Sequence, residues 1–184
     1  MDTDSDIVAT ARAFAVGAHG DQRYGKGEHA PPYVAHLDEV ARVLRELAGA
    51  PGDVALAAAY LHDVVEDTDT TAAAIETAFA RFGADVAARL AAIAGFCTDE
   101  PGPNRKQRKA ATYARMRRDV AAAPAWIRDA AQVKLADRIA NLRASHRDNP
   151  SLLEMYRRES ATFREALYVA GMCEPMWAEH DRLT

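Results

Sequence analysis

Apolar side chains recur at every third or fourth position along most of this chain, with polar side chains between them. In the first such stretch the apolar face consists of Ile7, Ala11, Phe14, Ala15 and Ala18. This spacing is that of an amphipathic α-helix, because residues three and four apart share one helical face. No stretch alternates apolar and polar residues as a half-buried strand does. The pattern therefore predicts an all-α protein.

Capping residues and loops divide the pattern into separate helices. Asp4 or Ser5 is a suitable N-cap for the first helix, which precedes the loop DQRYGKGEHAPPY over 21–33. Asp53 can cap a helix that continues through LHDVVED to residue 67. Further helices are expected from about 37 to 47 and over 71–82, 83–96, 105–120, 126–145 and 152–170. No repeat or linker separates them, so we predict one compact helical bundle over residues 1–184.

Composition narrows the class of protein. The 184 residues are 49% hydrophobic and only 7% aromatic, which favours helices packed through small side chains. The net charge of -4 gives no basic field to attract nucleic acid or an anionic membrane. Two isolated cysteines, Cys97 and Cys173, do not form a disulfide framework. With no signal-like start and no apolar run of membrane length, we expect a cytoplasmic protein; the oligomeric state stays open.

The stretch YLHDVVEDTDTT, residues 60–71, sets acidic doublets beside an apolar stripe. On a continuous helix His62 lies one turn from Glu66, and Asp63 lies one turn from Asp67. Carboxylates this close repel one another unless a proton or a cation relieves them. Imidazole and carboxylate together suit Mn, Fe or Zn; the simpler alternative is a solvated acidic face. Neighbouring residues diverge around a helix, so the remaining ligands must come from other helices.

Two residues elsewhere are candidates for those ligands. His36 stands where the loop turns into the second helix, and Asp137 stands among apolar residues in QVKLADRIANL. A buried aspartate needs a partner. Each residue also has a structural interpretation. His36 is then a histidine of the helix start or the core, and Asp137 forms a salt bridge with Lys134 or Arg138.

Four segments together resemble a known family. They are AHGDQRYGKGEHAPPYVAHLDEVARVL, YLHDVVEDTDTT, FCTDEPGPNRKQRKA and VKLADRIANLR. In the order H, HD, D they resemble the HD-domain metal-dependent phosphohydrolases. They are most similar to the (p)ppGpp hydrolase domain of RelA/SpoT-type enzymes and to the stand-alone small alarmone hydrolases. The resemblance covers about residues 8–170 and implies the helical fold of HD domains.

The resemblance implies a role for each matching position. The ligands of one divalent ion, usually manganese, with iron or zinc as alternatives, are His36, His62, Asp63 and Asp137. The acidic pair that positions and activates the attacking water is Glu66 and Asp67. The implied substrate-binding residues are Arg23, Lys26, Arg138 and Asn141. The implied reaction of the stringent-response alarmone is hydrolysis of the 3′-pyrophosphate of ppGpp or pppGpp to GDP or GTP and pyrophosphate.

The chain departs from the family at two places. Leu37 follows His36 where the family has proline, and Gln22–Lys26 replaces a Gln-x-Arg-Lys pattern. Arg23 and Lys26 therefore only flank the positions that hold guanine, and Tyr24 could stack on a base. One rival function is an HD phosphohydrolase for another nucleotide or a dinucleotide phosphate. The other is a metal-binding regulatory module without turnover, against which the Glu66–Asp67 pair argues.

For some other residues the sequence predicts a structural rather than a functional role. The basic run NRKQRK, residues 104–109, is expected to be a solvated helix start, with phosphate contact as the alternative. Trp126 and Trp177 are assigned to packing. His180 is expected at the surface.

Overall fold

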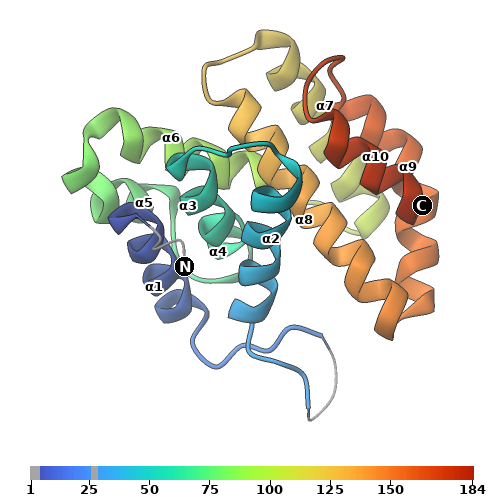
Figure 1. The fold of residues 1–184 in the computed structure, drawn as a ribbon, viewed down its shortest axis with the longest axis horizontal. Helices are drawn as coiled ribbons and strands as arrows, with labels where there is room; N and C mark the ends of the chain where they lie inside the picture. The colour runs from blue at the N-terminus through green and yellow to red at the C-terminus, as the bar shows by residue number, and fades with distance from the viewer. Residues whose placement is uncertain (1–4, 26–28) are drawn as a thin grey trace.

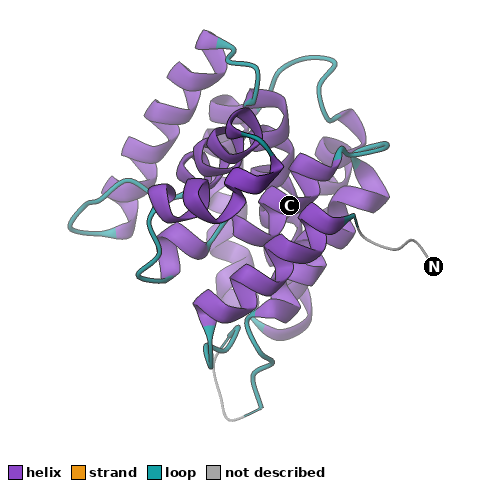
Figure 2. Ribbon diagram, turned by 90° about the vertical axis from the view of Figure 1, so that its left-hand side faces the viewer, coloured by secondary structure: helices purple, strands orange, loops and turns teal. Residues whose placement is uncertain are grey.

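The computed structural model describes residues 5–25 and 29–184. Its first six α-helices are α1 (Asp6–His19), α2 (Val34–Leu47), α3 (Asp53–Leu61), α4 (Val64–Asp67), α5 (Ala72–Phe79) and α6 (Ala84–Cys97). They are followed by α7 (Arg105–Ala122), α8 (Ile127–Asp148), α9 (Pro150–Leu167) and α10 (Glu174–Leu183), and a 3₁₀ turn, η1 (Ala80–Phe82), lies between α5 and α6. The described residues contain no strand, only an isolated bridge between Arg23 and Pro32 (Figure 2). The all-α prediction is confirmed.

Helix α8 is the central element of the fold. It packs against α2, α3 and α6 on one side and against α9 and α10 on the other (Figure 1). Every residue from 130 to 140 is buried, so this segment has no solvent-facing stripe. Three consecutive alanines of α3, Ala57, Ala58 and Ala59, are also fully buried. Small side chains let helix backbones approach closely, which explains how few aromatic residues this core needs.

The helix predicted to run through the acidic doublets is interrupted. Helix α3 ends at Leu61 and α4 begins at Val64, so the prediction of one continuous helix is wrong. The His62 imidazole donates from Nδ1 to the carbonyl oxygen of Ala59 at 2.7 Å. In a continuous α-helix that oxygen would accept the backbone N–H of Asp63. The side chain competes for this carbonyl, and the chain turns between the two helices.

Helix α2 begins earlier than the sequence pattern indicated. It starts at Val34, three residues before the predicted Leu37, after the Pro31–Pro32 pair. The N–H of His36 donates to the carbonyl of Tyr33 at 2.9 Å. A proline fixes φ near the helical value, so it suits the approach to a first turn. His36 consequently lies in the first turn of a helix that packs on α8.

The sequence pattern missed α10 entirely. Its buried residues are Met176, Trp177, His180 and Leu183, which share one helical face. Pro175 lies at the start of this helix. A proline usually ends a helix, but it is tolerated in the first turn. The surface prediction for His180 is wrong: the residue is fully buried and its ring stacks on Phe163 at 5.8 Å. The packing role of Trp177 is confirmed.

The remaining packing predictions agree with the fold. Trp126 is partly buried, with its ring 5.9 Å from that of Phe96. The basic run at 104–109 does form a helix start, with the Asn104 side chain accepting the N–H of Gln107. It is not solvated throughout, because the Lys109 side chain is only 14% exposed and pairs with Asp99. Within the described ranges, no helix is both long enough and apolar enough to span a membrane.

Candidate metal centre and active site

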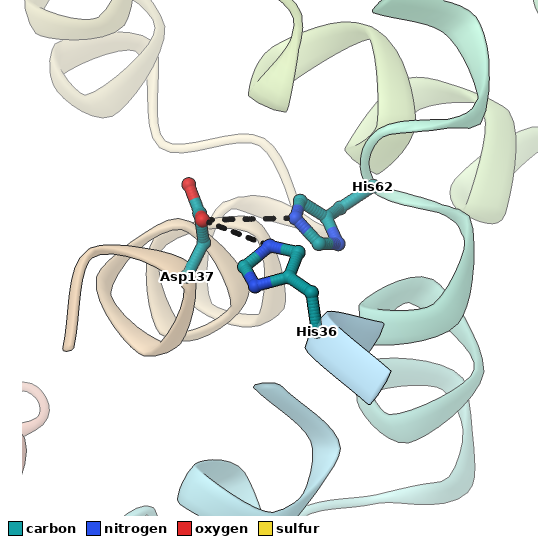
Figure 3. Close-up of side chains that lie close together, drawn as sticks. All are labelled: His36, His62 and Asp137. Carbon is teal, nitrogen blue, oxygen red and sulfur yellow. Dashed lines mark ion pairs between the residues drawn. The ribbon is translucent and has the colours of Figure 1, made fainter. Parts of the chain in front are cut away.

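Three of the predicted metal ligands meet at the place where α2, the end of α3 and α8 converge (Figure 3). Oδ1 of Asp137 lies 3.4 Å from Nε2 of His36 and 3.8 Å from Nε2 of His62. The possible ligand atoms of all three lie within 4.8 Å of one another. The residues are 3%, 0% and 8% exposed for His36, His62 and Asp137. We call these three residues the metal-binding cluster, because together they could bind a metal ion.

The hydrogen bonds of His62 suit a metal ligand. Its Nδ1 donates to the Ala59 carbonyl, so Nε2 is the ring nitrogen that can bind a metal once it is deprotonated. That Nε2 is buried and makes no hydrogen bond, although Oδ2 of Asp63 is only 3.0 Å away. Burial lowers the pKa of His62, but Asp63 and Asp137 raise it further, and the net direction is well above the ordinary value. The carboxylates thus attract positive charge to this point.

Asp63, the fourth predicted ligand, lies beside the cluster. Its Oδ2 is 3.0 Å from Nε2 of His62 and 3.5 Å from Nε2 of His36. The same oxygen accepts a hydrogen bond from the hydroxyl of Tyr33 at 2.7 Å. Burial raises the pKa of the Asp63 carboxyl, but the two histidines lower it more, so that it falls well below its usual range. Asp63 is therefore held as a carboxylate.

The acidic pair Glu66 and Asp67 lines the same cleft, but its two members have different partners. Oδ2 of Asp67 accepts from the Tyr33 hydroxyl at 2.6 Å. Oε2 of Glu66 accepts the backbone N–H of Asp99 at 3.0 Å. Burial raises the pKa of Glu66, with Lys134 opposing and Asp99 reinforcing the change. No hydrogen bond or ion pair joins Glu66 to His62 in the described part of the chain, since the turn after α3 separates them.

Four cations line the same cleft as these acids. Arg105 and Lys109 come from the first turns of α7, while Lys134 and Arg138 come from α8. The cleft is about 150 Å³ in volume. Its lining combines the metal-binding cluster side chains His36 and Asp137 with Tyr24, Tyr33, Asp63, Glu66, Asp67, Arg105, Lys109, Lys134, Arg138, Asn141 and Tyr156. A pocket that combines ligating groups with several cations suits an anionic, phosphate-bearing molecule.

The predicted substrate-binding residues do not all meet. Asn141 lines the cleft, and its amide donates to Oδ1 of Asp137. Arg23 does not line the cleft; its guanidinium donates to the carbonyl of Ala30 at 3.3 Å. Tyr24 takes that place, with its ring stacked 4.5 Å from that of His36 and its hydroxyl donating to Asn141 at 2.6 Å. Lys26 lies outside the described residues.

Arg138 lines the cleft but is largely engaged within the protein. Its guanidinium donates to the Tyr113 hydroxyl at 2.9 Å and lies 3.4 Å from a carboxylate oxygen of Glu159. It also lies 4.6 Å from the ring centre of Tyr156 and 4.5 Å from that of Phe163. An arginine between two rings is a cation–π arrangement that fixes its orientation.

Sequence reasoning missed five residues of the lining: Arg105, Lys109, Lys134, Tyr156 and Tyr33. The first two belong to the basic run, for which phosphate contact was only the alternative. The available signal was the spacing of four residues between Arg105 and Lys109, because this spacing places both side chains on one face of a helix. Lys134 was considered only as a partner of Asp137, and that salt bridge is present at 3.3 Å.

Comparison with known proteins defines the class. The family model of the HD domain matches residues 11–164, most of the chain, and the chain therefore belongs to the HD-domain family. The resemblance predicted from the four motifs is thereby confirmed.

Within that family the chain has named relatives. It is 36% identical over 151 residues to the mouse (Mus musculus) protein guanosine-3′,5′-bis(diphosphate) 3′-pyrophosphohydrolase MESH1, covering 82% of this chain and 76% of the relative. The human (Homo sapiens) MESH1 is 37% identical over 150 residues, covering 82% and 75%. A probable enzyme of the same activity from Synechocystis is 30% identical over 154 residues, which are 84% of this chain and 19% of that longer protein.

A solved structure confirms the fold class. The structure was described with the finding that a metazoan ortholog of SpoT hydrolyzes ppGpp. It superposes with a TM-score of 0.76 over 100% of this chain and 96% of the other, at 24% sequence identity. The helical HD-type architecture predicted from the sequence is the architecture of this chain.

Proposed function

We propose that this chain hydrolyses the 3′-pyrophosphate of ppGpp or pppGpp, releasing GDP or GTP and pyrophosphate. The observation that carries the proposal is one cleft lined by His36 and Asp137 of the buried metal-binding cluster, by an acidic pair and by four cations. The names of the MESH1 relatives supply the substrate, since those proteins are called 3′-pyrophosphohydrolases of guanosine-3′,5′-bis(diphosphate). A non-catalytic module would need the cluster but not the acidic pair.

The metal-binding cluster and Asp63 are proposed to hold one divalent cation, preferably Mn²⁺, with iron or zinc as substitutes. Such an ion supplies Lewis-acid chemistry, because it activates water and neutralises phosphoryl charge. The buried Nε2 of His62, which makes no hydrogen bond while Nδ1 donates to Ala59, supports its role as a ligand. The Tyr33 hydroxyl lies within hydrogen-bonding distance of both Asp63 and Asp67, and its single proton is shared between the two carboxylates.

Glu66 is proposed to accept the proton of the attacking water. Its Oε2 is occupied by the N–H of Asp99, which fixes the carboxylate and leaves Oε1 without a hydrogen bond in the described part of the chain. Burial strengthens this base by raising the pKa of Glu66. Asp67, bound to Tyr33, is proposed to position the same water.

Cations are proposed to bind the phosphates of the substrate. Arg105 and Lys109 present charge from α7, and Asn141 offers its amide beside the cluster. Polyphosphates need several charged or hydrogen-bonding groups besides the metal. Arg138 is proposed mainly to fix the lining of the cleft through Tyr113 and Glu159, and to bind phosphate only together with the other cations. Arg23 and Lys26 remain proposed contacts to the base.

A second function is favoured by one observation. Tyr24, not Arg23, lies in the cleft, so a flat ring rather than a guanidinium meets an entering base. Aromatic stacking accepts every base. An HD phosphohydrolase acting on a different nucleotide or dinucleotide phosphate is therefore the alternative.

Release of pyrophosphate and of phosphate would be measured for ppGpp, pppGpp, common nucleoside triphosphates and dinucleotides with Mn²⁺ present. The proposal expects pyrophosphate from ppGpp and pppGpp at the highest kcat/KM. Fast hydrolysis of another nucleotide beside weak turnover of ppGpp would favour the alternative. Turnover of none of them would favour the regulatory module.

The proposal also includes the setting of the enzyme. We place it in the cytoplasm as a single HD-type hydrolase domain. Support for a reducing compartment comes from Cys97 and Cys173, which are free thiols buried at separate places in the fold.

A further inference from the structure

One lysine of the cleft lining, Lys134, has no role in the proposed function. Lys134 lies on α8 one turn before Asp137 and is only 5% exposed. Its ammonium donates to the carbonyl oxygen of Cys97 at 2.9 Å and lies 3.3 Å from Oδ2 of Asp137. A buried ammonium is costly unless it is paired and hydrogen-bonded. These two oxygens therefore hold the charge of Lys134 at a fixed place.

Lys134 differs from the other cations of the cleft in its partner. The other three pair with Glu159 or Asp99, which lie outside the metal-binding cluster. Among the described residues, Asp137 is the one carboxylate within ion-pair distance of Lys134. Lys134 is thus the cation of the cleft whose ion-pair partner, Asp137, is itself a member of the metal-binding cluster.

The two oxygens of Asp137 are divided between different partners. Oδ2 faces the ammonium of Lys134, whereas Oδ1 faces His36 and accepts the amide of Asn141. Lys134 and Asn141 flank Asp137 along the same face of α8, at spacings of three and four residues. The carboxylate is consequently held from both sides, with Oδ1 presented to the two imidazoles.

We propose that Lys134 is a positioning residue that fixes Asp137 through Oδ2 and weakens the hold of the cluster on a divalent cation. The Lys134 ammonium and a bound cation are both positive and both interact with the Asp137 carboxylate, so each weakens the binding of the other. Lys134 thus lowers the affinity of the cluster for the cation. In return it fixes the orientation of the Asp137 carboxylate, because Oδ1 stays directed at the metal position. This inference deepens the proposed function by naming what sets the metal affinity of the same site.

The test is a Mn²⁺ titration by calorimetry without substrate on purified full-length variants. Lys134→Gln removes the charge but keeps a donor for Cys97, and Lys134→Met removes both. We expect both variants to bind Mn²⁺ roughly tenfold or more tightly than the wild type, because a near like charge has been removed. Lys109→Met is the matched control, since it removes a charge from the same cleft that pairs with Asp99. It should change Mn²⁺ affinity by no more than about twofold.

Activity supplies the second readout. At saturating Mn²⁺ we expect Lys134→Gln to lower kcat about tenfold, because Asp137 is then free to turn. A purely structural lysine would instead give weaker Mn²⁺ binding together with a lower Tm. Unchanged or weaker Mn²⁺ binding by Lys134→Gln overturns the proposal, and this variant decides the matter if Lys134→Met does not fold. Because the titration contains no substrate, inactivity of the wild type on ppGpp would overturn the proposed function without touching this inference.

Discussion

The inner end of the cleft and its rim are built in different ways. At the inner end, His36 and Asp137 come from packed helices and His62 from the turn after α3, and all three are almost wholly buried. At the rim, the loop between α1 and α2 contributes Tyr24, and the first turns of α7 contribute Arg105. The inner side chains contact one another, whereas Arg105 pairs with Glu159 on helix α9.

This difference separates two tasks. A ligand group must keep its geometry to within a fraction of an ångström, and buried helices supply that rigidity. A surface that selects substrates can be carried on loops and helix ends, which tolerate change. We therefore expect substitutions at the inner end to remove metal or turnover, and substitutions at the rim to alter KM.

The largest effect is expected from His62→Ala. Loss of a ligand should weaken Mn²⁺ binding by at least about 100-fold. In the wild type, Mn²⁺ at 100 times its Kd should stabilise the fold by about 2.7 kcal/mol, or roughly 5–10 °C in Tm for a chain of this size. The variant should lose that shift while its circular dichroism stays helical.

His146→Ala is the matched control for that experiment. His146 is exposed on α8, where its Nε2 contacts only the carbonyl of Leu183. It should keep the full Mn²⁺ shift in Tm. Normal Mn²⁺ stoichiometry in His62→Ala would show that the cluster is not the metal site.

Glu66→Gln should keep the metal and lose turnover. We expect kcat to fall by about 100-fold or more, because the amide cannot accept the proton of water. Calorimetric Mn²⁺ binding should stay within a few-fold of the wild type. The exposed Glu76 on α5 gives the matched Glu→Gln control, and it should be as active as the wild type. Normal kcat in Glu66→Gln would assign the acidic pair a structural role.

The sequence predicted the inner end far better than the rim. His62, Asp63, Glu66 and Asp67 stand within six positions, so local spacing alone brought them together. His36 and Asp137 required three-dimensional packing, and the family resemblance supplied it. The break after Leu61 was not predictable from periodicity, because it depends on the imidazole of His62 reaching a backbone carbonyl.

The rim was harder to predict because its residues meet through chain geometry rather than spacing. The loop over 21–33 carries Arg23 and Tyr24 side by side, and only the backbone decides which faces inward. There the N–H of Tyr24 donates to the carbonyl of Pro31 at 2.9 Å, and its ring turns onto His36. The family resemblance implied Arg23 and left Tyr24 as a candidate for stacking on a base, and the sequence could not decide which of the two faces the cleft.

At the rim, Lys109→Met should raise KM for the nucleotide about tenfold with little change in kcat. The reason is the loss of a charge-assisted contact to phosphate, which is worth roughly 1.5–3 kcal/mol. Arg23→Ala should raise KM less, by about threefold, because its guanidinium contacts Ala30 outside the cleft lining. Steady-state kinetics on the best substrate would measure both. A larger effect at Arg23 than at Lys109 would mean that the loop rearranges when substrate binds.

The smallest and most direct comparison uses two tyrosines that differ in place but not in chemistry. Tyr33→Phe removes a hydroxyl that bridges Asp63 and Asp67 at the inner end. Tyr24→Phe removes a hydroxyl that donates to Asn141 and not to a carboxylate, and it keeps the stacking on His36. A hydrogen bond contributes about 1 kcal/mol, or about fivefold in a rate. We expect Tyr33→Phe to lower kcat at least that much, and Tyr24→Phe to change KM by about twofold while leaving kcat unaltered. If the two variants had equal effects on kcat, the rim would share in the chemistry and the division between inner end and rim would fail.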